Sequence, residues 1–240
     1  MANRRRQAIS RAWARLVRVD AVLLLSLLIV VSCVWTFFKL ADAVTTRRAQ
    51  HFDEQIMRAL RDPVDLSKAV GPPWLTGAMR DLTSLGSAPV LVLFVLAVGG
   101  SLLVRRQLHA LVLLLVATSG GALLNGLLKD VFERERPHLA MRLTEVNSTS
   151  FPSGHAMDSA VIYLTLAALL ARLVEPLALK LYFLGLAVLL TFVVGLSRVY
   201  LGVHYPSDVL AGWAAGLAWA VLCSTAASYL QRKGSVEPPK

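Results

Sequence analysis

The stretch Ala110–Leu128 reads ALVLLLVATSGGALLNGLL, and the charged segment Lys129–Pro137 (KDVFERERP) follows it directly. A helix needs about 20 predominantly apolar residues to cross a bilayer, and this run has that length without a charged residue. Its small residues, among them Ser119, Gly120 and Gly121, are typical of helices that pack closely against neighbours in a membrane. The run therefore predicts a transmembrane helix with a charged end.

Six runs of this kind occur along the chain. They are Ala21–Leu40, Ala88–Val104, Ala110–Leu128, Ala156–Val174, Leu179–Gly195 and Val209–Leu230. Hydrophobic residues make up 56% of the 240 residues and the mean hydropathy is +0.60, which is unusual for a soluble domain when the apolar residues form long blocks. We therefore expect an all-α fold, a polytopic membrane domain over residues 21–230 with six transmembrane helices.

The first run could instead be the apolar core of a cleaved signal peptide, because six arginines precede it. The run is longer than such a core, and no clear small-x-small cleavage motif follows it, which favours a retained span. Residues 1–20 then form a basic cytoplasmic N-terminus. Residues 231–240 are expected to be a disordered cytoplasmic tail.

The net charge of +10 raises the possibility of a nucleic-acid partner. The basic residues, however, lie beside the apolar runs: Arg105 and Arg106 follow the second run, and Arg172 and Lys180 lie between the fourth and the fifth. This is the positive-inside pattern of membrane proteins, so we expect no nucleic acid. It places both termini in the cytoplasm and the segments after the first, third and fifth runs outside, and a bacterial inner membrane fits so compact a chain.

The longest connection, Ala41–Ser87, has apolar residues at helical spacing in two places, one on each side of Gly71. It predicts two short amphipathic helices at the bilayer surface. These helices could gate a lipid substrate or could only cover the bundle, and amphipathicity alone favours a cover. The two cysteines, Cys33 and Cys223, lie within apolar runs and have no metal-binding spacing, so we interpret them as small buried side chains.

Polar motifs stand at the ends of three runs. They are Lys129–Pro137, Pro152–His155 (PSGH) and Ser197–Asp208 (SRVYLGVHYPSD). If the six runs cross the membrane, all three motifs lie on the same face. Any one of these residues could be an interfacial anchor or a helix cap, but ionisable groups that gather at span ends need a shared reason.

That reason is found in the chemistry of phosphoryl transfer. A phosphoryl group in transfer spreads negative charge over its oxygens, and fixed positive charges and hydrogen-bond donors stabilise it. Lys129, Arg136 and Arg198 can supply the charge. Ser153 and Gly154 can supply backbone N–H donors at the start of a helix, and the lack of a side chain at Gly154 permits close approach.

The presence of two histidines indicates two separate catalytic roles: one attacks phosphorus and the other transfers protons. Asp208, four residues after His204, can hold the second ring nitrogen of a nucleophilic histidine. Pro206 disfavours helix at the residue before it, so we expect His204 in a loop and Asp208 in the first turn of the last helix. His155 has no comparable partner in the sequence, which suits the role of acid and base.

The combined pattern K-x6-RP, PSGH and SR-x5-H-x3-D resembles that of the type 2 phosphatidic acid phosphatase superfamily, and every motif position is filled. The resemblance implies a metal-independent lipid phosphate phosphatase with no cofactor, in which His204 is the nucleophile that forms a phosphohistidine and His155 the acid and base. Substrates in that superfamily include phosphatidic acid, phosphatidylglycerophosphate, isoprenyl diphosphates and lipid A phosphates. The motifs select neither the lipid nor the oligomeric state.

Two alternatives to a hydrolase remain. A lipid phosphotransferase would use the same residues and pass the phosphoryl group to an acceptor lipid. A transporter of a phosphorylated ligand would need polar groups along a path through the midplane. The spans contain few such groups, chiefly Asn125 and Asp158, and Asp158 could also be a partner of the phosphate site.

Overall fold

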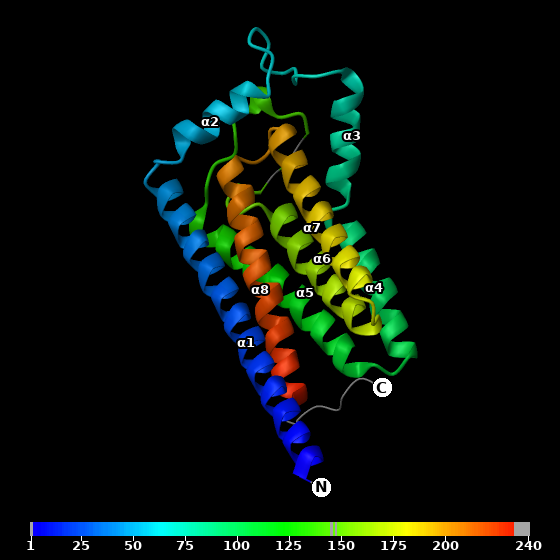
Figure 1. The fold of residues 1–240 in the computed structure, drawn as a ribbon. Coiled ribbons are helices and arrows are strands. Elements are labelled where there is room, and N and C mark those ends of the chain that lie inside the picture. Colours follow the sequence, from blue (N-terminus) through cyan, green and yellow to red (C-terminus); the bar gives the residue numbers. More distant parts are fainter. Residues whose placement is uncertain (1, 145, 147, 233–240) are drawn as a thin grey trace.

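The computed structural model describes residues 2–144, 146 and 148–232 (Figure 1). Regular structure in this part of the chain is helical, and no strand occurs there. The helices are α1 (Ala2–Thr45), α2 (Gln50–Ala59), α3 (Pro73–Ser84), α4 (Ala88–Val104), α5 (Leu108–Phe132), the 3-10 helix η1 (Leu139–Met141), α6 (Gly154–Leu173), α7 (Leu177–Tyr200) and α8 (Pro206–Arg232). The predicted disordered tail begins inside α8, and its remainder, residues 233–240, lies outside the described residues.

Five helices are long and apolar enough to cross a membrane: α1 from Ala21 onward, α5, α6, α7 and α8. α3 and α4 meet at a bend of 45° and together form a sixth candidate span. The predicted all-α membrane architecture is confirmed, with five spans, or six when the bent α3–α4 pair is counted as one. One detail differs, because α3 continues into α4 through that bend and is not an isolated surface helix.

Close contact between backbones holds α8 against α6, the central helix of the bundle. A Cβ atom at Gly212 would lie 2.7 Å from the carbonyl oxygen of Ser153, and one at Gly216 would lie 2.6 Å from that of Met157. Only glycine allows the two helices to approach so closely. The contact joins their first turns, where the N–H of Ser153 donates to the carbonyl oxygen of Asp208 at 3.0 Å.

The outward faces of the spans carry large exposed apolar side chains. Leu24, Leu93 and Leu123 are 66%, 67% and 66% exposed. Hydrocarbon is the solvent that accommodates such faces, while the helical backbone satisfies its own hydrogen bonds. The protein is therefore an integral membrane protein.

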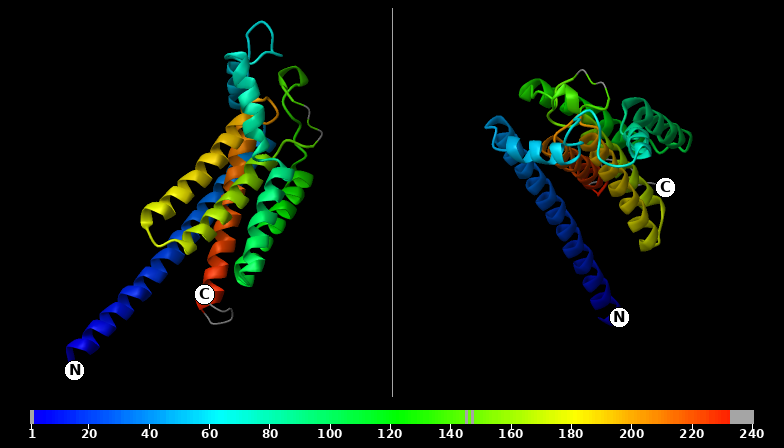
Figure 2. Two further views of the ribbon diagram at one scale, coloured as in Figure 1. Left: turned by 90° about the vertical axis from the view of Figure 1, so that its right-hand side faces the viewer. Right: turned by 90° about the horizontal axis from the view of Figure 1, so that it is seen from above.

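The two short helices lie at one end of the bundle. α2 crosses this end, as the view from above in Figure 2 shows, and α3 packs on α7. α1 packs along α8 but diverges from the other helices toward its N-terminus (Figure 2, left). The ends of α5 and α7 and the starts of α6 and α8 meet beneath α2 and α3.

Candidate active site

The eight predicted site residues lie at the end of the bundle that α2 and α3 cover (Figure 1). Lys129 lies in the last turn of α5, His155 in the first turn of α6 and Arg198 in the last turn of α7. The remaining members are Arg136, Ser153, Gly154, His204 and Asp208. The fold thus brings the three motifs together.

His204 lies in the connection between α7 and α8 and is 1% exposed. Gly202, with a φ of +76°, allows this connection to turn. The Nη1 atom of Arg136 lies 3.2 Å from Nε2 of His204. A guanidinium can only donate, so Nε2 accepts and the ring proton resides on Nδ1. The lone pair that a nucleophile requires is therefore on Nε2.

The surroundings of His204 keep its imidazole neutral. Burial lowers the pKa of His204 well below its ordinary value, and the positive charges of Arg136, Arg198 and Lys129 lower it further. The same three cations would attract an anion to this position. The predicted nucleophile is thus a neutral imidazole surrounded by positive charges.

Asp208 lies beside the other ring nitrogen of His204, as the sequence predicts. Its Oδ2 atom is 3.6 Å from Nδ1 of His204, which is an electrostatic contact and too long for a hydrogen bond. Oδ2 instead accepts hydrogen bonds from Oγ of Ser150 at 2.5 Å and from the N–H of Tyr205 at 2.9 Å. The carboxylate is thereby fixed next to the imidazole.

The three cationic side chains of the site donate hydrogen bonds to small polar side chains. Nζ of Lys129 and Nη2 of Arg136 both donate to Oγ of Ser148, at 3.3 and 3.0 Å. Nη1 of Arg198 donates to Oγ1 of Thr83, on α3, at 3.0 Å. The bent α3–α4 pair therefore contacts a predicted phosphate ligand directly.

Gly154 keeps the space beside Lys129 open. A Cβ atom at Gly154 would lie 2.9 Å from Nδ2 of Asn125 and 3.6 Å from Nζ of Lys129. The amide of Asn125 also lies 3.3 Å from each carboxylate oxygen of Asp158, one turn after His155. The predicted packing role of Asn125 thus extends to a polar contact next to the site.

Several buried polar atoms of this cluster have no hydrogen-bond partner among the described residues. They include Oγ of Ser153, Nε of Arg198 and Oδ1 of Asn125. An unsatisfied buried polar group costs about 1–3 kcal/mol, so native structures rarely leave several together without a purpose. Their position among three cations indicates that an anion completes their hydrogen bonds.

Sequence reasoning missed Arg134 and Asp53, although both lie against Asp208 or its neighbours. Nη1 of Arg134 lies 2.5 Å from Oδ1 of Asp208, and Nη2 lies 2.8 Å from Oδ2 of Asp53 on α2. Arg134 could have been found from its position two residues before Arg136, within the same motif. No local pattern indicates Asp53, because its partners Arg134 and Ser207 lie 81 and 154 residues further along the chain.

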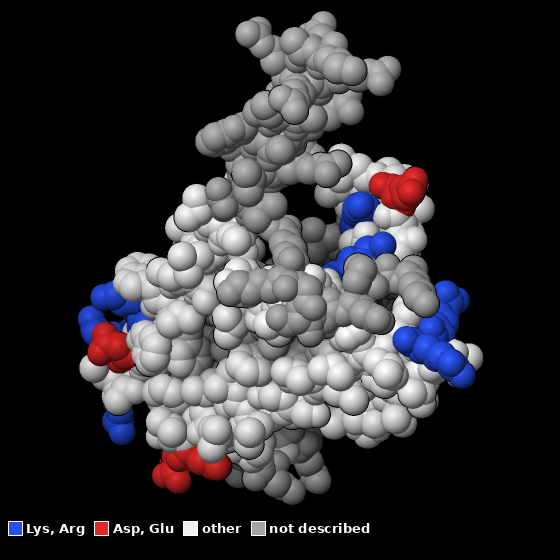
Figure 3. Space-filling model, turned by 90° about the horizontal axis from the view of Figure 1, so that it is seen from below, with Lys and Arg blue, Asp and Glu red and all other residues white. Residues whose placement is uncertain are grey.

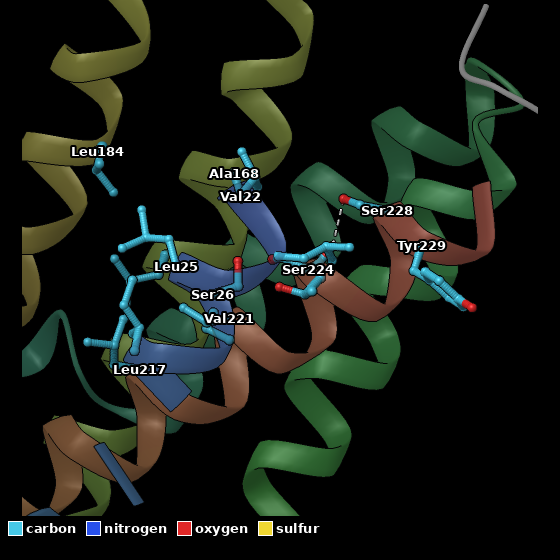
Figure 4. A pocket seen from close by; sticks show the side chains of 15 residues that line it. Val22, Leu25, Ser26, Ala168, Leu184, Leu217, Val221, Ser224, Ser228 and Tyr229 are labelled. Atoms are coloured by element: carbon cyan, nitrogen blue, oxygen red, sulfur yellow. Dashed lines mark hydrogen bonds between the residues drawn. The ribbon is translucent and has the colours of Figure 1, made fainter. Parts of the chain in front are cut away.

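A separate cavity of about 630 Å³ lies toward the opposite end of the bundle, between α1, α6, α7 and α8 (Figure 4). Its lining is mostly apolar, with Leu25, Leu184 and Leu217 on different helices. None of the predicted site residues lines it. Among the described residues, no three His, Cys, Asp or Glu side chains are grouped so that they could hold a metal ion.

A sequence profile described as the PAP2 superfamily matches residues 110–232, which include all eight predicted site residues. The chain belongs to the PAP2 superfamily. Phosphatidylglycerophosphatase B of Bacillus subtilis (strain 168) is 35% identical over 183 residues, which are 75% of this chain and 86% of that protein. Decaprenylphosphoryl-5-phosphoribose phosphatase of Mycobacterium tuberculosis is 33% identical over 156 residues, which are 62% of this chain and 79% of that protein.

Two solved structures resemble the fold described above. A transmembrane PAP2-type phosphatidylglycerolphosphate phosphatase from Bacillus subtilis superimposes with a TM-score of 0.76 and 34% identity, covering 85% of this chain and 98% of that chain. LpxE of Aquifex aeolicus gives a TM-score of 0.53 and 25% identity, covering 74% of this chain and 95% of that chain. The resemblance predicted from the motifs is confirmed, and so is the predicted class, a membrane phosphatase of the PAP2 superfamily.

Proposed function

We propose that this PAP2 protein removes phosphate from a membrane lipid phosphate or diphosphate by way of a phosphohistidine. The observation that carries the proposal is the cluster of three cations and two histidines around unsatisfied buried polar atoms at one end of the spans. A lipid can present its phosphate at this level while its chains stay in the bilayer. The relatives named as phosphatidylglycerophosphatase and decaprenylphosphoryl-phosphoribose phosphatase favour a glycerophospholipid phosphate or an isoprenyl phosphate as substrate.

The first chemical step follows from the tautomer of His204. Its Nε2 lone pair attacks phosphorus, and the N–P bond forms as the bond from phosphorus to the lipid oxygen breaks. His155 gives its proton to that leaving oxygen. Asp208 stabilises the positive charge that develops on the phosphorylated ring, because its carboxylate lies 3.6 Å from Nδ1.

The second step reverses the roles of acid and base. His155, now neutral, takes a proton from a water molecule as that water attacks phosphorus. The N–P bond breaks, inorganic phosphate leaves, and both histidines regain their starting states. In both steps the equatorial oxygens are held by the predicted phosphate ligands, which are Lys129, Arg136, Ser153, Gly154 and Arg198.

The same proposal assigns an orientation in the membrane. The end of the bundle opposite the site carries Arg105 and Arg106, between α4 and α5, Arg172 in the last turn of α6 and Lys180 in the first turn of α7. Seen from below, the edges of the described surface carry Lys and Arg side chains together with some Asp and Glu side chains (Figure 3). The positive-inside rule then places that end and both termini in the cytoplasm and the site on the outer face, which is periplasmic if the membrane is a bacterial inner membrane.

Phosphate release by the purified protein tests the proposal. We expect free phosphate from at least one of phosphatidic acid, phosphatidylglycerophosphate and an isoprenyl diphosphate, in detergent with excess EDTA, because cationic side chains provide the charge stabilisation. Transfer to an added acceptor lipid without free phosphate would identify a phosphotransferase. No phosphate release from any of the three lipids, or a strict need for Mg²⁺, would contradict the proposal.

A further inference from the structure

The carboxylate of Asp53 is buried although its helix, α2, lies at the end of the bundle. The residue is 0% exposed. Oδ1 accepts the N–H of Ser207 at 3.0 Å, and Oδ2 accepts Oγ of Ser207 at 2.5 Å and Nη2 of Arg134 at 2.8 Å. A buried charge is unfavourable without such partners. The first outer segment is therefore joined to the start of α8 by a charged contact.

Arg134 lies between two carboxylates, and these hold its guanidinium in place. Nη1 donates to Oδ1 of Asp208 and to Oγ of Ser207, at 2.5 and 2.8 Å, while Nη2 donates to Asp53. Its guanidinium lies over the ring of Tyr205, 4.2 Å from the centroid. Burial alone would lower the pKa of Arg134, but the two carboxylates outweigh burial and raise it. Unlike Arg136 and Arg198, Arg134 is paired with carboxylates and is not a phosphate ligand.

The arrangement determines which oxygen of Asp208 faces the nucleophile. Arg134 occupies Oδ1, so Oδ2 is left for Ser150, Tyr205 and the electrostatic contact with His204. Two carboxylates and one guanidinium carry a net charge of −1. That charge remains next to the imidazole when its nitrogen is phosphorylated.

We propose that Asp53, acting through Arg134, is a positioning residue that orients Asp208 and maintains the negative charge beside His204 during phosphoryl transfer. This inference rests on the function proposed above. Asp53 touches neither substrate nor reacting atoms. It neutralises Arg134, which would otherwise cancel the charge of Asp208. The first outer segment then contributes to catalysis. Its amphipathic pattern alone had favoured only a cover over the bundle.

A purely structural role for Asp53 would be to anchor α2 on the bundle. The two roles differ in the electrostatics at His204. Asp53→Asn removes a negative charge near the imidazole, so the pKa of His204 falls and the acid limb of kcat/KM moves to lower pH. Arg134→Gln removes a positive charge, so the limb moves to higher pH. If Asp53 only anchored α2, its replacement would shift the acid limb of kcat/KM in neither direction.

Other charged or titratable groups around His204 stay unchanged in these variants. They are Lys129 of α5, His155 of α6, Arg198 of α7, Asp208 of α8 and Arg136 of the loop before α6. Glu54→Gln is the matched control, because Glu54 follows Asp53 on α2, hydrogen-bonds Gln50 and acts electrostatically on Tyr205, but has no described contact with Arg134 or Asp208. The double variant Asp53→Asn/Arg134→Gln restores the net charge of −1 and should return the limb toward the position of the parent.

The experiment measures kcat, KM and the pH profile for the purified parent and these variants in detergent. We expect Asp53→Asn to lower kcat about tenfold or more with little change in KM, and Glu54→Gln to match the parent. Parental kcat and an unmoved limb in Asp53→Asn would overturn the inference, and so would limb shifts of the same sign in both single variants. Failure of Asp53→Asn to fold would assign Asp53 to stability and would also overturn it.

The same data separate this inference from the proposed function. If the parent hydrolyses none of the three lipids, the proposed function fails. If the parent is active and His204→Ala is not, while Asp53→Asn behaves as the parent, only the positioning role of Asp53 fails.

Discussion

Arg136 donates through Nη1 to Nε2 of His204 at 3.2 Å, so the proposed nucleophile and a proposed phosphate ligand are hydrogen-bonded to each other. The same guanidinium also donates to the carbonyl oxygen of Val203 at 2.6 Å. An incoming phosphate attracts this guanidinium more strongly than neutral acceptors do. Binding of the substrate should therefore release the lone pair that attacks it.

The relationship predicts a pH effect of Arg136→Gln. In the parent, burial and then Arg136 depress the pKa of His204. Neutral, reactive histidine thus persists as pH falls until that depressed pKa is reached. Removing the arginine raises the pKa, so the acid limb of kcat/KM should move to higher pH, and the plateau should fall about 10²–10³-fold because a phosphate ligand is lost. The exposed Arg58→Gln on α2 is the control and should leave the limb in place; an unmoved limb in Arg136→Gln would contradict the account.

Arg198 should bind the equatorial oxygens of the transferring group. Vanadate mimics the trigonal-bipyramidal transition state, so Arg198→Ala should weaken vanadate inhibition and turnover together. Arg198→Lys should recover little, because a point charge does not replace a planar fork. Thr83→Val removes only the 3.0 Å contact that orients Nη1 and should give a smaller loss of both. Titration of activity with vanadate measures the effect, and full activity in Arg198→Ala would exclude this role.

Much of this arrangement could be predicted from the sequence. Apolar runs with charged ends specify six spans, and Pro206 places His204 in a loop before α8. Asp53 and Arg134 could not be found in this way, because their contact joins segments 81 residues apart and depends on how α2 crosses the bundle. The bend between α3 and α4 was missed for a related reason, since hydropathy records length and composition but no direction.

The glycines of α8 should be critical for stability. Gly216→Ala places a Cβ about 2.6 Å from the carbonyl oxygen of Met157, so α8 must move away from α6. Overpacking of this kind costs about 1–3 kcal/mol, which should lower the melting temperature in detergent. Gly185→Ala on α7 is the control, because nothing lies within 4 Å of its Cβ position. Equal melting temperatures for the two variants would show that the α6–α8 contact is not tight.

The proposed orientation can be tested with single cysteines in a background that lacks Cys33 and Cys223. Ser67, between α2 and α3, and Glu175, between α6 and α7, are both exposed and lie at opposite ends of the bundle. An impermeant thiol reagent on intact cells should label Ser67→Cys and not Glu175→Cys, and lysis should permit labelling of both. The reverse pattern in intact cells would place the site in the cytoplasm.

The central claim is that Nε2 of His204 becomes covalently phosphorylated. The most direct measurement is a rapid quench in base, which preserves phosphohistidine, after mixing the protein with a lipid labelled at the reacting phosphorus. The account predicts acid-labile label on the parent protein and none on His204→Ala, with the variant still folded by its melting temperature. Equal labelling of the two proteins, or hydrolysis by His204→Ala at the rate of the parent, would contradict it.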